Sequence, residues 1–353
     1  MVPVSDEKRD FTAKLLIIFA LILITIIALF LLYKLTDMLF VIFAGILVAV
    51  MLNGLTQLMQ NYTKLPRIYS LLLVILILIG IFVFMTWFMV PRVSEQANRL
   101  MKSIPDATEK IKGFLEEYQI SERILGETSD PGQLLPLGSK MIDRLSNLFS
   151  VTVGAVIDVF VILFLGIYLG ANPQLYIRNF IKLFPPGRRE RMHEVFRTLG
   201  TAMQWWLLGR FALMMVLGIL TYIALKILGI PMALTLALIV ALLSFIPYIG
   251  AIVSIIPAIL VALAVEPIKA VYVLIVYLGI QLLESYLITP LIQQKAVSIP
   301  PALVISAQII FAVLVGPLGV FLATPLTLVI VILVQLLYIE DILGDKVQLL
   351  GQH

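Results

Sequence analysis

The sequence predicts an all-α polytopic membrane protein with about eight membrane segments, two of them broken into re-entrant-like helical hairpins, plus an extramembrane amphipathic helical region. Three observations support this fold class. Of the 353 residues, 61% are hydrophobic and only 13% are charged, about half the charged fraction of a soluble domain. Several stretches without charge are long enough for a helix to cross the hydrocarbon core, which needs about 20 residues. Two of these stretches repeat one spacing of prolines.

The N-terminal region, residues 1–90, contains three apolar segments, at about 13–33, 36–58 and 68–90, joined by short polar connections. Each segment has about the length of one membrane span. The first is too long for the apolar part of a cleavable signal peptide, so we expect it to remain in the protein.

A polar stretch follows at 91–149, with eight Lys or Arg residues against nine Asp or Glu residues. Its apolar residues recur every three, four or seven positions, which is typical of amphipathic helices, and we expect a bend near Pro105. These helices can simply lie on the membrane or pack on each other, or they can have a regulatory or gating role. The sequence leaves both interpretations open.

Region 150–204 combines a fourth span with a basic loop. Residues 172–201 carry six Lys or Arg residues and two Glu residues, and positively charged loops remain in the cytoplasm. Counting spans from this loop places both termini in the cytoplasm and residues 91–149 outside. The expected location is the cell (plasma) membrane.

The region 205–337 contains an internal repeat, with copies at 205–265 and 268–337, and precedes a C-terminal tail at 338–353. Pro231 and Pro247 are 16 residues apart, as are Pro301 and Pro317, and the two pairs are offset by 70 residues. Secondary transporters are commonly built from such repeats. We therefore interpret 205–337 as a transport core.

Each copy contains a Pro/Gly break, PYIG at 247–250 and GPLG at 316–319. Two full crossings need about 40 residues plus a turn, but residues 231–265 supply only 35. Half-depth hairpins that open from opposite membrane faces fit this length, and they give the inverted-repeat plan of alternating-access carriers. Kinked single spans remain the alternative, since Pro and Gly are frequent in membrane helices.

The strongest candidate site residue is Glu284, because ionisable groups inside spans are costly and rare. It belongs to a polar stripe at helical spacing that also contains Gln281, Ser285 and Thr289. Glu284 can bind a substrate, proton or cation, or it can pair with Lys295 or Arg210 and only fix the packing. Arg210 itself is expected to reach the membrane interface as an anchor.

Further candidates for the substrate or ion pathway flank the two breaks, where irregular backbone at membrane depth lines a polar cavity or is buried in protein. They are Ser244, Pro247, Tyr248, Gly250, Pro317, Gly319, Thr324 and Pro325. Asp158, near the outer third of the fourth span, is a weaker candidate, because a carboxylate close to the interface can be hydrated.

Composition argues against several classes. The chain has no cysteine and two histidines, so we expect no metal site, no cofactor and no enzymatic triad. No nucleotide-binding P-loop occurs. The basic residues cluster beside apolar segments, where they indicate topology, so no nucleic-acid partner is expected.

The stretches 228–263, 284–305 and 316–326 resemble the autoinducer-2 exporter family, also called the PerM-like permeases. The likeness extends over nearly the whole chain, including the basic segment PPGRRER at 185–191. The family motif residues carried over are Pro247, Tyr248, Gly250, Pro257, Glu284, Pro290, Pro317, Gly319 and Pro325. The segment GANPQ at 170–174 departs from relatives, which often have a charged pair there.

The resemblance implies about eight membrane segments with broken helices, a homo-oligomer such as a pentamer, and an elevator-like movement. It also implies export of a small polar signalling molecule in quorum sensing, with autoinducer-2 as the example. Some similar proteins are credited with Na+(Li+,K+)/H+ antiport, so an alkali cation and a proton are the alternative partners. A non-transporting membrane scaffold or channel is a third interpretation.

Overall fold

The computed structural model describes residues 4–81, 83–84, 87, 91, 153–292 and 299–345, and the regular structure in this part of the chain is helical. The predicted helices within 92–149, and Lys295, lie outside the described residues. The principal elements are α1 (Val4–Thr63), α5 (Val153–Ala171), α6 (Pro173–Ile181), α7 (Arg189–Ile227), α8 (Ala233–Leu243), α9 (Ile249–Val265), α10 (Pro267–Leu283), α11 (Thr289–Ile292), α12 (Pro301–Val315) and α13 (Pro317–Leu333).

Four helical segments of the described chain are long and apolar enough to cross a membrane. They are Lys34–Thr63, Pro186–Ile227, Pro267–Ile292 and Pro317–Glu340. A fifth results if α5 and α6, which meet at an angle of 83°, form one broken span. The chain is thus an all-helical, multi-pass membrane protein. In this part of the chain, α8, α9 and α12 are shorter apolar helices.

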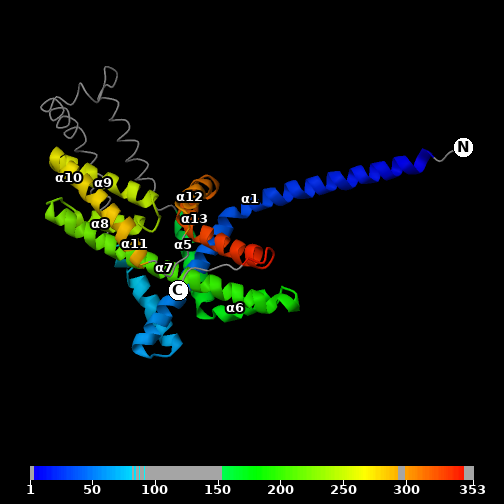
Figure 1. Ribbon diagram of the computed structural model, residues 1–353, viewed down its shortest axis with the longest axis horizontal. Helices are drawn as coiled ribbons and strands as arrows, with labels where there is room; N and C mark the ends of the chain where they lie inside the picture. The colour runs from blue at the N-terminus through cyan, green and yellow to red at the C-terminus, as the bar shows by residue number, and fades with distance from the viewer. Residues whose placement is uncertain are drawn as a thin grey trace, which may run out of the picture.

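The prediction of a polar connection between the first two apolar segments is wrong, because α1 runs without interruption through Lys34 and Asp37. Neither proline nor glycine occurs between residues 4 and 44 to end the helix. At 60 residues the helix is about 90 Å long, about three times the thickness of the hydrocarbon core. Figure 1 shows its N-terminal half extending away from the other helices.

The predicted basic loop is largely helical, since α7 already begins at Arg189 and continues for 39 residues. Near this end, Arg191 forms ion pairs with Glu194 at 2.6 Å, Asp341 at 2.9 Å and Glu340 at 3.0 Å. Glu340 is the last residue of the π-helical extension of α13, Val334–Glu340, and Asp341 follows it. These contacts connect the start of α7 to the C-terminal end of the described chain.

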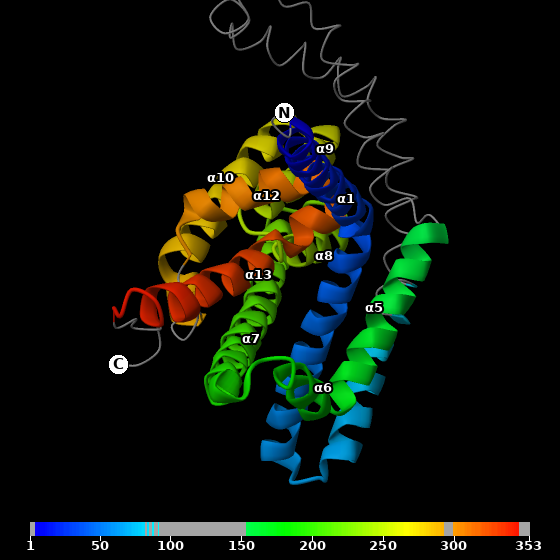
Figure 2. The ribbon, with the colours of Figure 1, turned by 90° about the vertical axis from the view of Figure 1, so that its right-hand side faces the viewer.

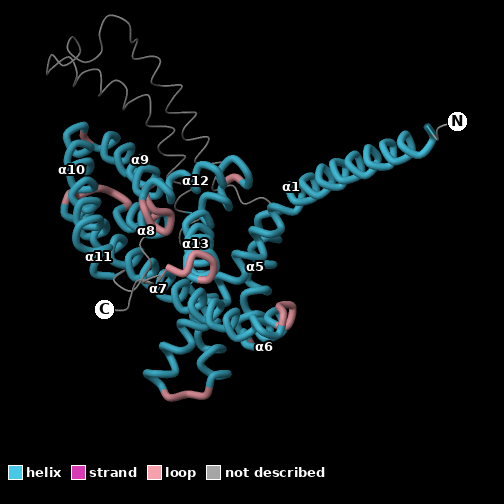
Figure 3. Tube along the Cα trace, turned by 45° about the vertical axis from the view of Figure 1, so that its right-hand side comes forward, coloured by secondary structure: helices cyan, strands magenta, loops and turns pink. Residues whose placement is uncertain are grey.

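The two predicted breaks separate helices that pack side by side, α8 with α9 and α12 with α13 (Figures 2 and 3). Pro247 has no N–H for a continuing helix, and Tyr248 adopts a positive φ of 62° before α9 begins. At the second break, Gly316 has a φ of 74° and Pro317 occupies the first position of α13, where proline is favoured.

Two glycines allow the helices at each break to come close together. A Cβ atom added to Gly250 would overlap the carbonyl oxygen of Leu243, and one added to Gly319 would overlap the carbonyl oxygen of Phe311. Because both obstacles are backbone atoms, neither can move aside as a side chain does. Both hairpins therefore depend on a residue without a side chain close to the turn.

We expect Gly250→Ala and Gly319→Ala each to destabilise the protein by about 1–3 kcal/mol, the usual cost of overpacking. The measurement is thermal or denaturant unfolding of the purified protein in detergent. Gly279→Ala in α10 is the matched control, because nothing lies within 4 Å of the added Cβ. That control should be neutral or stabilising by up to about 1 kcal/mol, and equal losses in all three variants would contradict the explanation.

Candidate functional site

The turn between α8 and α9 is held by a buried arginine. Arg210 is only 4% exposed, and its Nε donates a hydrogen bond to the carbonyl oxygen of Phe245 at 3.1 Å. Arg210 is therefore not the interface anchor that the sequence analysis expects. Because α7 starts far before the apolar part of the chain, Arg210 lies within the helix, 17 residues before its end.

A second side chain holds the same turn from the other repeat copy. Gln308 of α12 is fully buried, at 0% exposure, and its Nε2 donates a hydrogen bond to the carbonyl oxygen of Pro247 at 3.0 Å. A backbone carbonyl can only accept, so this contact fixes which end of the Gln308 amide faces the turn. The first break is thereby bonded to the hairpin that contains the second.

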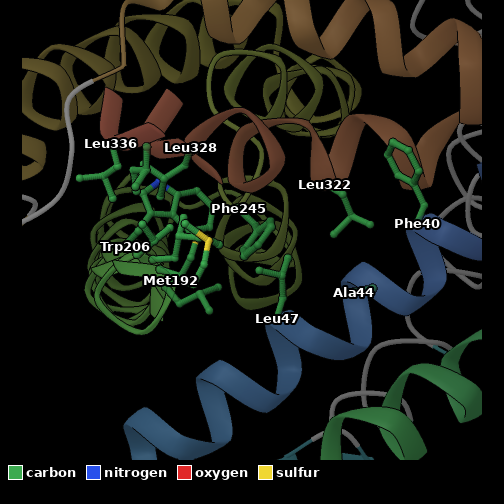
Figure 4. Close-up of a cluster of buried hydrophobic side chains, with 14 of the residues drawn as sticks. Phe40, Ala44, Leu47, Met192, Trp206, Phe245, Leu322, Leu328 and Leu336 are labelled. Carbon is green, nitrogen blue, oxygen red and sulfur yellow. The ribbon is translucent and has the colours of Figure 1, made fainter. Parts of the chain in front are cut away.

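Aromatic side chains join the two hairpins beside these hydrogen bonds. The ring of Phe245 stacks on Phe321 of α13, with centroids 4.1 Å apart and planes at 14°. Trp206 of α7 packs edge-on against Phe245, with the ring centroids 5.8 Å apart. Figure 4 shows Phe245 and Trp206 within one cluster of buried residues that also includes residues of α1 and α13.

Glu284 lies near Arg210, and the two charges attract each other. Residues Glu284–Ile288 form a π-helical turn inside an otherwise α-helical segment. Such turns occur often at functional sites, and this one accommodates Pro290, which cannot donate to the carbonyl four residues before it.

The structure brings together only some of the predicted site residues. Ser244, Pro247 and Tyr248 form the α8–α9 turn and Gly250 starts α9, while Tyr248 and Glu284 both interact electrostatically with Arg210. The predicted polar stripe is not uniform, because Ser285 is exposed whereas Gln281, Glu284 and Thr289 are partly buried. The turn at 284–288 changes the helical register on which the stripe was based.

The second break supplies Pro317 and Gly319 at the start of α13, with Thr324 and Pro325 buried further along that helix. Asp158 lies apart from the turn. It is exposed on α5, which packs along α1.

Sequence reasoning missed the hydrogen bonds by which Arg210 and Gln308 hold the α8–α9 turn. Two signals were available. Arg210 lies in the interior of a long helical segment, and Gln308 is a large amide in an apolar run that otherwise holds only small polar side chains between residues 299 and 334. Polar groups of this size inside a membrane segment are expensive unless they are bonded.

Several buried polar atoms near the hairpins have no hydrogen-bond partner among the described residues. They include Gln308 Oε1 and Thr324 Oγ1 in α12 and α13, and Thr221 Oγ1 and Tyr277 Oη in α7 and α10. A buried polar atom without a partner costs about 1–3 kcal/mol. The described residues contain no group of three or more His, Asp or Glu side chains that could hold a metal ion.

The chain is similar to known transport proteins. The profile described as "AI-2E family transporter" matches residues 16–339. "Putative transport protein YueF" of Bacillus subtilis is 25% identical over 299 residues, which is 81% of this chain and 80% of the relative. "AI-2 transport protein TqsA" of Escherichia coli is 24% identical over 298 residues, covering 82% of this chain and 83% of the relative. "Putative transport protein YrrI" of B. subtilis is 27% identical over 279 residues, covering 75% and 77%.

A double-mutant cycle tests whether Arg210 and Glu284 stabilise one another. We expect Arg210→Gln and Glu284→Gln each to destabilise the protein, because each leaves the other charge in a poorly hydrated position. The double variant should recover about 1–2 kcal/mol relative to the sum of the single losses. Unfolding in detergent measures all four proteins.

The control pair is Glu266 and Lys269, which are 3.9 Å apart and more exposed to solvent. A coupling of less than about 0.5 kcal/mol is expected there, as for surface ion pairs. Additive losses at Arg210 and Glu284 would show that their attraction contributes nothing to the fold.

Proposed function

The chain belongs to the AI-2E transporter family, and on that premise we propose that it is a secondary transporter that exports a small polar solute, such as autoinducer-2 (AI-2), by an elevator-like alternating-access mechanism. The name of the E. coli relative describes AI-2 transport. The proposed pathway runs beside the α8–α9 turn and the α12–α13 hairpin.

The observation that carries this proposal is the contact between the two breaks. The α8–α9 turn receives a hydrogen bond from Gln308 of α12, and Phe245 of the turn stacks on Phe321 of α13. In inverted-repeat transporters, substrates bind where the broken helices of both repeats meet. In this chain the two breaks also lie in contact with each other's hairpins, although they are about 70 residues apart in the sequence.

The arrangement of α8 and α9 supports a re-entrant hairpin in the membrane. The turn reaches Arg210, about 26 Å along α7 from its C-terminal end, so the hairpin would extend through most of a hydrocarbon core of about 30 Å. Each of α8 and α9 packs on a longer neighbour, α7 and α10 respectively. The irregular backbone at the turn is thus covered by protein, as its depth in a membrane requires.

A neutral solute suits this site better than an alkali cation. Arg210 is buried and bonded to the turn, and its positive charge disfavours a cation there. Cation and proton antiport would instead require Glu284 to exchange a proton for a metal ion beside a fixed positive charge. We therefore keep antiport as the alternative, with Glu284 as the residue that separates the two functions.

The proposal extends to the assembly and its orientation. The protein would be a homo-oligomer in the cell membrane, with residues 172–201 and the C-terminal tail in the cytoplasm. The expected cytoplasmic N-terminus depended on two crossings before residue 64, where α1 is one continuous helix. The basic residues of 172–201 support that orientation, because they are expected to remain on the cytoplasmic side.

Counterflow in proteoliposomes tests the transport function. Vesicles loaded with unlabelled AI-2 should accumulate labelled AI-2 with saturable kinetics when they contain the wild-type protein, and protein-free vesicles should not. Glu284→Gln should retain measurable AI-2 exchange because the solute carries no charge that must be balanced by this carboxylate. Saturable Na+/H+ exchange that Glu284→Gln abolishes would favour the antiporter, and no saturable flux of any solute would favour a scaffold.

Cysteine labelling tests the hairpins, since the chain contains no cysteine. In the hairpin arrangement Glu266→Cys lies outside the cell and reacts with an impermeant maleimide, while Gln294→Cys does not. Kinked single spans reverse both results. Arg188→Cys, in the basic segment, is the cytoplasmic control and should react only after the membrane is opened.

A further inference from the structure

Two buried oxygen atoms in the α12–α13 hairpin lack hydrogen-bond partners among the described residues, Gln308 Oε1 and Thr324 Oγ1. Gln308 is 0% exposed and Thr324 is 4% exposed. The two residues stand eight positions before and eight positions after Gly316. Each is therefore about 12 Å from the turn along its own helix, at matching levels on the two arms.

The geometry of Gln308 explains why its acceptor is left over. Its Nε2 donates to the Pro247 carbonyl, so the opposite end of the amide, Oε1, must face away from the α8–α9 turn. A flipped amide would place two oxygen atoms against each other and lose that hydrogen bond. The unpartnered acceptor is thus a direct consequence of the contact that joins the hairpins.

Thr324 differs from its neighbour Thr327 in the same helix. The Thr327 hydroxyl donates to the Ala323 carbonyl at 2.7 Å, the usual way in which a helical threonine is satisfied. Thr324 makes no such bond. The next residue, Pro325, has no N–H, so it also cannot donate to the carbonyl of Phe321. The carbonyl of Phe321 therefore has no backbone donor within α13, and the Thr324 hydroxyl has no partner beside it in the described part of the chain.

We propose that Gln308 Oε1 and the Thr324 hydroxyl form a polar subsite for one hydroxyl group of the transported solute. A solute hydroxyl can donate to Gln308 Oε1 and accept from Thr324, which satisfies both protein atoms. This inference rests on the proposed transport function. The nearby guanidinium of Arg210 bonds to Phe245, whose ring stacks on Phe321, and its positive charge disfavours an alkali cation here.

The subsite is closed to solvent in this structure, because both atoms are buried. A solute can reach it only when the α12–α13 hairpin moves relative to the α8–α9 turn. Such a movement separates Gln308 from Pro247 and Phe321 from Phe245. Binding would thereby be coupled to release of the contact between the hairpins.

Thermal unfolding of the purified full-length protein tests the subsite without requiring transport. AI-2, ribose and glycerol are titrated separately, in sodium chloride and in choline chloride. We expect at least one of these probes to raise the Tm of the wild type saturably. Thr324→Val should weaken the apparent affinity about three- to ten-fold, which corresponds to the loss of one neutral hydrogen bond.

Thr327→Val is the matched control, since Thr327 is equally buried but bonded within its own helix, and its affinity should equal that of the wild type.

Three results would overturn the subsite. The first is an equal affinity for the probe in Thr324→Val and Thr327→Val, and the second is the absence of a Tm shift with any hydroxylated probe. The third is a sodium-dependent Tm shift that only Thr324→Val removes, because it would assign the oxygen atoms to a cation. The counterflow experiment remains separate. AI-2 exchange can fail while ribose still raises the Tm of the wild type and has a weaker effect on Thr324→Val. That combination would reject AI-2 as the substrate and retain the subsite.

Discussion

The buried guanidinium of Arg210 constrains the arrangement of the C-terminal half. A buried charge is tolerated only when it is bonded, and the structure supplies the Phe245 carbonyl. The carbonyl is available because the chain between α8 and α9 is not helical. The break thus leaves a carbonyl to which Arg210 can bond, while the arginine keeps the irregular turn against α7. Each feature therefore depends on the other.

The second hairpin extends the same principle. Gln308 satisfies another carbonyl of the turn, so side chains from both repeat copies replace the hydrogen bonds that a continuous helix would have made. Stacking of Phe245 on Phe321 adds apolar contact at the same place. Because one turn is bonded from two sides, relative movement of the hairpins must exchange several contacts at once. That requirement favours two discrete arrangements over a continuous range of positions.

Hydropathy and proline spacing were sufficient to predict the helical class and both breaks, since Pro247 and Gly316–Pro317 impose local backbone constraints that the sequence displays directly. The packing of the breaks against each other depends on contacts between residues 61 and 76 positions apart, Pro247 with Gln308 and Phe245 with Phe321, which no local pattern reports. Arg210 was misjudged because its surroundings depend on where α7 begins. The uninterrupted α1 was missed because polar Lys34 and Asp37 resemble a connection, although neither breaks a helix.

The length of α7 has a mechanical consequence. Its ion-paired residue Arg191 and the buried Arg210 stand 19 residues apart on one unbroken helix, a distance of about 28 Å. If the helix pivots by about 10° at Arg191, Arg210 moves by about 5 Å, which exceeds the length of a hydrogen bond. The helix can therefore act as a lever that turns about Arg191. The ion pairs of Arg191 with Glu194, Glu340 and Asp341 hold this end of the helix. Ionic conditions that weaken the ion pairs of Arg191 can thus act on the α8–α9 turn about 28 Å away.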